Sequence, residues 1–554
     1  MRLRHPIAIP FCRPALAIAC ALAFAAPASA QYTSSNRDVL APNTGAWSAT
    51  GVTLGGTTFR NLGLQGVGRF AASSIDAATG ETLGSISDMQ ITNFVNNGNG
   101  SWSGRFHFLP DRGFNAGLIF SNYAARINTF DFTFTPYTGL APTLAQNQIA
   151  MSFTGSTRFT YADAVTGGQA YTTGLLATAT RSLFGTTAPA SGVATTQSDG
   201  TLANRLTMDA EGLILDNRAG KAGSGWVGDE YGAYLYRFNS GKEIVGQLQL
   251  PAALIPNAPN GTINFAADPP TSGRRINQGM EGIAQSPDGT RVFSLLQSAT
   301  LQDSAAGNVG RSNTRLVVYD VSGSDTPTTP IAQYVIQLPR VDDNGASGGV
   351  NVNRTGAQSA ILALNNHQLL ILSRDGNGRG ANNGVPVFKS VLLADLSAAT
   401  NINGSFDGTA AAVAPGGILN ASVTPIAWTE ALNMLGSLNG GNELARFNLN
   451  MLAANGNANT ISEKWEALGM VPVGDGSGDY FLFVGNDNDF QSATGAYMNA
   501  AGLLQGYDAG LENDTMVLAY RVSAVPEPET WGMLMAGLCL IGSMARRARN
   551  RGPA

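Results

Sequence analysis

Short stretches of apolar or alternating apolar and polar residues recur along the chain, and Gly, Asn or Asp bounds each of them. Runs of this length between turn-forming residues are typical of β-strands, and stretches with helical periodicity are scarce. We therefore predict an all-β protein. The clearest predicted strands are Arg105–Leu109, Ala233–Phe238, Arg291–Leu296, Arg315–Val321, Leu369–Leu372, Val387–Ala394, Tyr480–Val484 and Thr515–Val522.

Three segments are variants of one unit, which consists of a Glu, a short strand, a turn and a second strand that ends in polar residues. The Glu residues of these units are Glu211, Glu281 and Glu466. Weaker copies of the second half of the unit occur at Phe106–Gly113 and Leu370–Gly376. Strand pairs that recur with a fixed polar position are typical of a β-propeller, in which the first strand of each blade lines a central channel.

The spacing of these units is irregular, which indicates long insertions between them. Two stretches rich in small and polar residues, Tyr161–Gly200 and Asn401–Asn442, are the candidate loop insertions. We predict a propeller of six or seven blades.

The N-terminus has the pattern of a secretory signal peptide. Three arginines precede an apolar run at Ala15–Ala25, and Ala28-Ser29-Ala30 provides the small residues of a cleavage site. We expect cleavage after Ala30, so that residues 1–30 are not part of the fold.

The C-terminus carries a second targeting pattern. Val525–Thr530 is a Pro/Glu-rich spacer, Trp531–Ala545 is an apolar run, and four arginines follow. This arrangement resembles the PEP-CTERM sorting tail of Gram-negative bacteria. The resemblance implies recognition by an exosortase-type transpeptidase and export across the inner membrane to the cell envelope or an exopolysaccharide matrix.

The apolar run has 15 residues, which is short for a bilayer span of roughly 20. We expect a short C-terminal hydrophobic transmembrane helix that anchors the chain only transiently and is processed near Pro526–Thr530. The predicted domains are the signal peptide at 1–30, the propeller at 31–524 and the sorting tail at 525–554.

Composition narrows the chemistry of the body. All three cysteines lie in the terminal segments, so the body has no disulfide and no cysteine nucleophile. Without the three arginines of the signal peptide and the four arginines and two glutamates from Val525 onward, the body has 26 basic and 36 acidic residues. This acidic balance does not favour nucleic acid as a partner. His107 and His367 are its only histidines, which disfavours histidine-dependent hydrolysis.

The order of these units along the chain resembles the phytase-like domain family described as esterase-like activity of phytase. The resemblance rests on the Glu-Gly units, Asp229-Glu230-Tyr231-Gly232, Pro287-Asp288-Gly289, Ser373-Arg374-Asp375 and Asn486–Phe490, and it extends from about Gly56 to Val522. It implies a secreted propeller that hydrolyses an ester. Two departures are Gln297, where the other units end in acids, and Ala467, where the others have Gly after the Glu.

We expect the acids at the strand ends to gather at the channel mouth. Clustered carboxylates repel one another unless a cation or a proton compensates them, and calcium prefers 6–8 hard oxygen ligands. The predicted catalytic residues are Glu211, Glu281, Glu466 and Arg374, the predicted substrate-binding residues are Arg112 and Tyr231, and the predicted calcium ligands are Asp229, Glu230, Asp487 and Asp489. Such a site fits hydrolysis of a phosphoester or another small ester.

Other interpretations of the same residues stay open. These acids can instead cap turns or accept hydrogen bonds from backbone amides, with no ligand. At the level of function, the alternative is a non-catalytic propeller in the envelope that binds exopolysaccharide or calcium. A purely structural surface protein is a third.

Overall fold

The computed structural model describes residues 31–526 except 49, 117–118, 197–199, 201, 267–269, 306–309, 343–353, 381–383, 439–440 and 452–455. Within these residues the regular structure is β-strand, apart from the short 3-10 turns η1 (Pro415–Gly417) and η2 (Ala445–Phe447). The same residues include no helix of the length and apolar character that a membrane span needs. The all-β prediction is confirmed. The predicted signal peptide and C-terminal helix lie outside the described residues.

Three of the large sheets have four strands each, in chain order from the inner strand outward. Blade 1 consists of β4 (Asp88–Asn96), β5 (Trp102–Leu109), β8 (Arg126–Phe134) and β9 (Ile149–Arg158). Blade 3 consists of β19 (Met280–Gln285), β20 (Arg291–Leu296), β21 (Asn313–Asp320) and β22 (Ala332–Gln337). Blade 4 consists of β25 (Ala357–Ala363), β26 (Gln368–Arg374), β27 (Lys389–Asp395) and β28 (Ala427–Asn433).

The other two large sheets recruit strands from elsewhere in the chain. Blade 2 consists of β15 (Ala210–Leu215), β16 (Gly225–Asp229), β17 (Tyr234–Phe238) and β18 (Glu243–Leu248), with β10 (Thr160–Asp163) and β11 (Gly168–Tyr171) added at its outer edge. Blade 5 runs from β31 (Lys464–Pro472) through β32 (Tyr480–Asp487) and β35 (Thr515–Pro526) to β3 (Thr57–Phe70) and β2 (Val52–Leu54). All eight strands predicted from the pattern are present.

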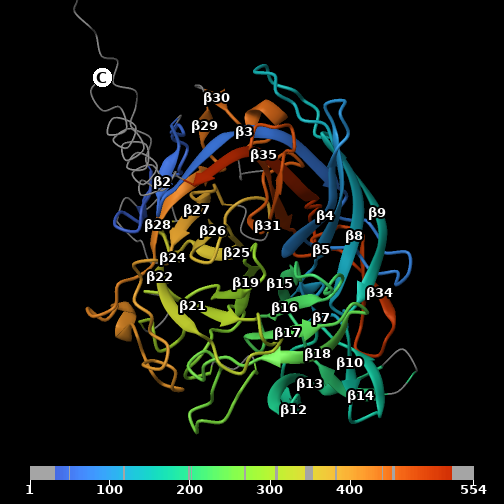
Figure 1. Cartoon of the computed structure of the whole chain (residues 1–554). Coiled ribbons are helices and arrows are strands. Elements are labelled where there is room, and N and C mark those ends of the chain that lie inside the picture. Colours follow the sequence, from blue (N-terminus) through green and yellow to red (C-terminus); the bar gives the residue numbers. More distant parts are fainter. Residues whose placement is uncertain are drawn as a thin grey trace, which may run out of the picture.

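The inner strands close a ring, which makes the body a β-propeller (Figure 1). Each inner strand contacts the next, in the order β4, β15, β19, β25, β31 and back to β4. They enclose a cavity of about 160 Å³ at one end of the channel, lined by apolar residues of all five strands such as Ile91, Ile214 and Ile361. The described residues thus form five blades, and the predicted six or seven are not confirmed.

The N-terminal strand closes the ring. β3 pairs antiparallel with β35 along its whole length, from Thr57 opposite Pro526 to Phe70 opposite Thr515. Figure 1 shows the two strands side by side, blue against red, although they lie at opposite ends of the sequence. Val525 and Pro526, which the prediction assigns to the sorting tail, are the last two residues of β35.

The predicted loop insertions are more ordered than the composition indicates. Tyr161–Gly200 contains β10 and β11, and also β12 (Ala179–Leu183) and β13 (Thr186–Thr196), which join β14 (Leu202–Leu206) in a separate sheet. Asn401–Asn442 contains the outermost strand of blade 4. Both stretches are rich in small residues, yet tertiary pairing partners make strands of them.

The hydrophobic core lies between neighbouring blades rather than at one centre. Tyr319 is buried between blades 2 and 3, Trp428 between blades 3 and 4, Trp465 between blades 4 and 5, and Phe483 between blades 5 and 1. This arrangement holds each inner strand at a fixed distance from the channel axis, which positions the side chains at its start.

Candidate functional site

Three glutamates meet at the end of the channel where the inner strands begin. Glu211, Glu281 and Glu466 each stand at a register shift between the first and second strands of their blades. A bulge at this place turns the side chain toward the axis, since it inserts one extra residue in the inner strand. One carboxylate oxygen of each lies within 4.8 Å of the others. The structure therefore brings the three predicted catalytic glutamates together.

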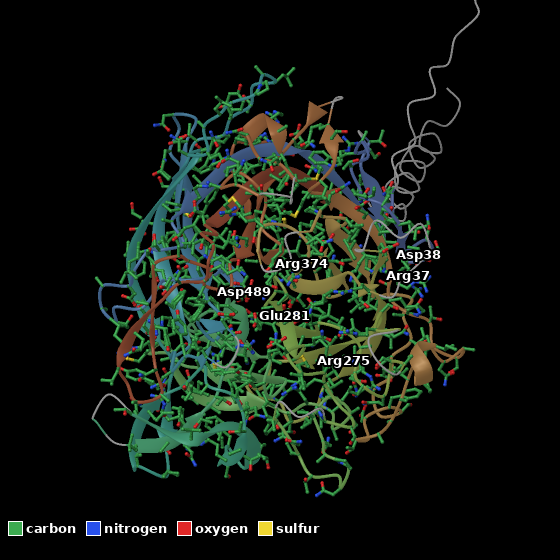
Figure 2. All side chains as sticks on the ribbon, turned by 180° about the vertical axis from the view of Figure 1, so that it is seen from behind. Arg37, Asp38, Arg275, Glu281, Arg374 and Asp489 are labelled. Carbon is green, nitrogen blue, oxygen red and sulfur yellow. The ribbon has the colours of Figure 1, made fainter. Side chains whose placement is uncertain are left out.

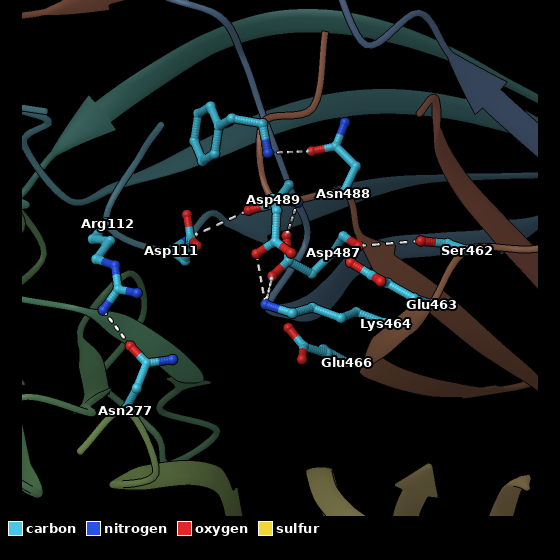
Figure 3. Close-up of polar contacts among 12 residues, drawn as sticks. Asp111, Arg112, Asn277, Ser462, Glu463, Lys464, Glu466, Asp487, Asn488 and Asp489 are labelled. Carbon is cyan, nitrogen blue, oxygen red and sulfur yellow. Dashed lines mark hydrogen bonds and ion pairs between the residues drawn. The ribbon is translucent and has the colours of Figure 1, made fainter. Parts of the chain in front are cut away.

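Four aspartates extend this group into a continuous acid cluster, which we define as Asp111, Asp209, Glu211, Glu281, Glu466, Asp487 and Asp489. Asp111, Asp209 and Glu211 form one set of oxygens within 4.8 Å, and Asp111, Asp487 and Asp489 form another. Figure 3 shows Asp111 facing Asp487 and Asp489, with Glu466 below them. In Figure 2, the labelled Glu281, Arg374 and Asp489 lie near the centre of the ring.

Three cations partly neutralise the acid cluster. Arg112 Nη1 lies 2.5 Å from Asp209 Oδ2, and Lys464 Nζ lies 2.6 Å from Asp489 Oδ1 and 3.4 Å from Asp487 Oδ2. Arg374 is paired with Glu466. Seven acids against three cations leave a formal excess of negative charge in a site that is mostly buried.

Burial makes that excess costly. It raises the pKa of Glu211, Glu281 and Asp111 well above the ordinary range, and the neighbouring carboxylates raise them further. Burial also raises the pKa of Asp487 to about 7. Near neutral pH, the folded cluster therefore holds protons or needs added positive charge.

Some carboxylate oxygens of the acid cluster have no hydrogen-bond donor. Glu281 is 2% exposed; its Oε1 accepts a hydrogen bond from Gln297 Nε2 at 2.8 Å, while its Oε2 has no partner. The carboxylate of Glu211 accepts no hydrogen bond from the described residues. A buried carboxylate oxygen without a donor is costly, and a hard cation satisfies it. The acid cluster thus has carboxylates that could hold a metal ion, and calcium is a cation that prefers such oxygen ligands. Gln297, a departure from the repeat, orients Glu281.

Two of the predicted calcium ligands, Asp229 and Glu230, lie outside the acid cluster. Asp229 is fully buried and accepts backbone hydrogen bonds from Asp209, Tyr231 and Gly232 at 3.0, 3.3 and 2.8 Å. Asp229 therefore organises the turn after β16. This agrees with the alternative interpretation, in which such an acid accepts hydrogen bonds from backbone amides and binds no ligand. Glu230 lies beside Asp209 instead, and burial followed by the charge of Asp209 raises its pKa well above the ordinary range. Its Oε1 has no partner, so it can extend the acid cluster.

The predicted substrate-binding residues are only partly available. Tyr231 is 6% exposed and donates its hydroxyl to Gly174 O at 3.2 Å, so its ring is packing and not an open stacking surface. The guanidinium of Arg112 lies 5.5 Å from the centre of that ring. Arg112 and Arg374 are both held by carboxylates, and each keeps one Nε–H without a partner.

The most accessible part of the cluster is at Lys464 and Asp489, whose side chains are 27% and 25% exposed. Asp489 has a left-handed backbone, with φ of 51°, and its N–H donates to Asp487 Oδ1 at 2.7 Å. Neither histidine belongs to this region: His107 Nε2 hydrogen-bonds Thr92, and His367 lies in an exposed turn.

Sequence reasoning missed Asp111, Asp209 and Lys464 as members of the site. Each of them adjoins a recognised repeat position: Asp111 follows the second strand of blade 1 as Asp487 ends that of blade 5. Asp209 lies two residues before Glu211, and Lys464 two before Glu466. Aligning all copies of the repeat by their strand ends would have found them.

The fold and the acid cluster define a β-propeller with a candidate cation site at its axis. The sequence model of the family described as "Esterase-like activity of phytase" matches residues 83–490, and the chain belongs to this phytase-like family. A PEP-CTERM protein-sorting motif matches residues 524–550. This motif implies processing by exosortase-type sorting machinery and association with the cell envelope.

A relative from the fungus Arthroderma benhamiae, described as an uncharacterized secreted protein, is 29% identical over 481 residues, which cover 80% of this chain and 89% of that protein. Among solved structures, the Dos1 propeller is 7% identical and covers 83% of this chain and 94% of its own, with a TM-score of 0.25. The aldose sugar dehydrogenase of Streptomyces coelicolor is 9% identical, with coverages of 85% and 100% and the same TM-score of 0.25. The propeller assignment rests on the sheet topology and not on these scores.

Proposed function

We propose that this protein is an exported hydrolase of ester bonds, with phosphoesters as the first substrate class, and that its acid cluster works with bound calcium. The observation that carries the proposal is the meeting of Glu211, Glu281 and Glu466 within 4.8 Å, with a free buried oxygen on Glu281. Membership of the phytase-like family supports the reaction class.

The residues divide into two roles in this proposal. Glu211, Glu281, Glu466, Asp111 and the aspartates near Lys464 would hold the cation. Calcium, when bound, would attract an ester or phosphate oxygen and make a coordinated water more acidic.

Arg374 and Arg112 would recognise the negative charge of the substrate. A guanidinium can bind phosphate oxygens through paired N–H groups, and both arginines have an unused Nε–H at the site. Arg374 is paired with Glu466, and Arg112 is paired with Asp209. Calcium bound to either carboxylate would weaken its ion pair with the arginine, so that the guanidinium could bind the substrate.

A non-catalytic propeller that binds exopolysaccharide or calcium in the envelope is the second candidate. The sorting motif at 524–550 favours it, since it directs the chain to the envelope whatever the chemistry. The prior pairing of both arginines also agrees with a site built only to hold a cation.

Hydrolysis of p-nitrophenyl phosphate and p-nitrophenyl acetate by the purified protein, with calcium and with chelator, separates these candidates. We expect calcium-dependent turnover of the phosphate ester that falls by at least roughly a hundredfold in Glu211→Gln. Glu243→Gln, on the outer part of blade 2, is the matched control. Calcium binding without turnover of either ester would favour the binding propeller. The absence of both turnover and calcium binding would contradict the hydrolase and a calcium-binding propeller.

A further inference from the structure

A second polar pocket lies on the outer side of blade 1, away from the channel. It is a cavity of about 250 Å³ between the start of β8, the end of β9, β11, β14 and the hairpin of β33 (Gly495–Met498) and β34 (Leu504–Tyr507). Figure 1 shows β34 beside the outer strands of blade 1. Three arginines line the pocket: Arg126, Arg158 and Arg205.

Among the described residues, carboxylates neutralise only one of these arginines. Arg126 pairs with Glu81 at 2.5 Å and with Asp76 at 3.4 Å, and its Nε donates to Ala124 O at 2.9 Å. Arg158 and Arg205 have no carboxylate partner among the described residues. Arg158 donates to Tyr171 OH at 3.1 Å and lies over that ring at 3.9 Å. The pocket therefore carries excess positive charge inside an acidic protein.

Arg205 is the more unusual of the two. It is 3% exposed and donates to Asn122 Oδ1 and, at 3.4 Å, to Thr196 O, but its Nε has no partner. Burial and the nearby charge of Arg158 lower its pKa to about 10. A buried guanidinium without a counter-ion is costly, and a bound oxyanion would remove that cost.

A second polar group without a partner restricts the chemical class of the ligand. Glu81 lines the same pocket. Its Oε2 accepts a hydrogen bond from Arg126, while its Oε1 is buried without a partner. A carboxylate oxygen repels an anion but accepts a hydrogen bond from a hydroxyl. The volume is that of a small ligand and not of an extended chain.

We propose that this pocket binds a small hydroxylated anion, such as a monosaccharide unit that carries a carboxylate or a phosphate. Arg205 and Arg158 take the oxyanion, Glu81 accepts a hydroxyl, and the ring of Tyr171 holds Arg158 in place. The site is separate from the acid cluster and needs no calcium.

Isothermal titration calorimetry of the full-length protein in chelator tests this proposal, with D-glucuronate, glucose 6-phosphate, inorganic phosphate and neutral glucose as probes. We expect one or both sugar anions to bind, glucose not to bind, and Arg205→Gln to weaken binding by roughly 10- to 100-fold. Because Arg205 is buried, the half-exposed Arg158→Gln serves as the second variant. Arg105→Gln, which breaks an exposed pair with Asp131 on the same blade, is the control.

Binding of glucuronate but not of glucose 6-phosphate identifies the oxyanion as a carboxylate, and the reverse result identifies a phosphate; both support the pocket. Equal binding by Arg158→Gln, Arg205→Gln and the wild-type protein would overturn it, and so would the absence of any anion binding. If inorganic phosphate binds as tightly as glucose 6-phosphate, the role given to Glu81 is wrong.

Discussion

At the scale of single residues, the acid cluster is a place where folding opposes electrostatics. Glu281 is held by Gln297 on one oxygen and has nothing on the other, while Glu211 and Glu466 approach it. In the absence of a cation, the fold must overcome repulsion among these carboxylates or bind protons. The same arrangement becomes favourable when calcium is present, because the cation satisfies several oxygens at once.

Glu281→Gln should therefore change two properties in opposite directions. The amide keeps an acceptor for Gln297 and presents an N–H₂ group to the neighbouring carboxylates. We expect the calcium-free protein to gain on the order of 1–3 kcal/mol of unfolding free energy near pH 8, and calcium affinity to fall roughly tenfold or more. Urea unfolding without calcium and calorimetric titration with calcium measure the two effects.

Glu243→Gln is the control for this prediction. Glu243 lies on β18, outside the acid cluster, and its side chain accepts a hydrogen bond from Asn239. It should change neither property. A variant at Glu281 that is less stable without calcium and binds it normally would show that Glu281 has a purely structural role.

At the scale of elements, the glycine after the glutamate explains the Glu-Gly repeat. A Cβ on Gly212 would lie 2.7 Å from Ile283 Cγ1 and 2.9 Å from the backbone oxygen of Glu281. The inner strand of the next blade passes at this point, so the absent side chain lets β15 and β19 approach. In blade 5 the equivalent position is Ala467, which is buried in the hydrophobic core between blades 5 and 1, together with Met89 of blade 1. The repeat motif thus combines a ligand with a packing requirement.

We expect Gly212→Ala to lower the free energy of unfolding by about 1–3 kcal/mol, because the added methyl overpacks the contact between two blades. Gly168→Ala on β11 is the matched control, since a Cβ there meets nothing within 4 Å. Chemical denaturation of the three proteins gives the comparison. Equal stability of the Gly212 variant and the wild type would show that the inner strands can move apart without cost.

At the scale of the whole molecule, the ring concentrates buried acids at its axis, and this sets how stability responds to pH. The pKa of Asp487 is raised from 3.8 in the unfolded chain to about 7 in the folded protein. The folded state then binds more protons than the unfolded state between these values, so stability is highest below about pH 4 for this group and falls until about pH 7.

The calcium-free protein should accordingly melt at a lower temperature near pH 8 than near pH 5, and saturating calcium should reduce that difference. Differential scanning calorimetry at both pH values, with and without calcium, measures it. Glu430 is buried in blade 4, and its pKa is raised to about 7. It contributes to the same loss of stability with rising pH, and calcium does not remove that contribution because Glu430 lies outside the acid cluster. A pH response identical with and without calcium would contradict a cation site in the acid cluster.

Much of the fold could be predicted from the sequence, because strand alternation and turn residues are local signals. The eight predicted strands are present, and the five copies of the repeat, two of them weak, correspond one to one with the five blades. The prediction of six or seven blades is not confirmed, and the five blades leave much of the chain length outside their strands. Inserted strands such as β10 to β14 and the long connection before β28 account for that length.

The sequence by itself determined the strand pattern, the export and sorting signals, and three glutamates at equivalent repeat positions. Only the tertiary structure decided which acids meet. Asp111 and Asp209 join the acid cluster while Asp229 turns to backbone amides, since bulges and blade closure, and not local pattern, aim these side chains. The pocket around Arg205 was equally hidden, because its residues come from segments up to hundreds of positions apart. Packing between segments that are distant in the sequence brings such residues into contact, and the local sequence pattern contains no signal for it.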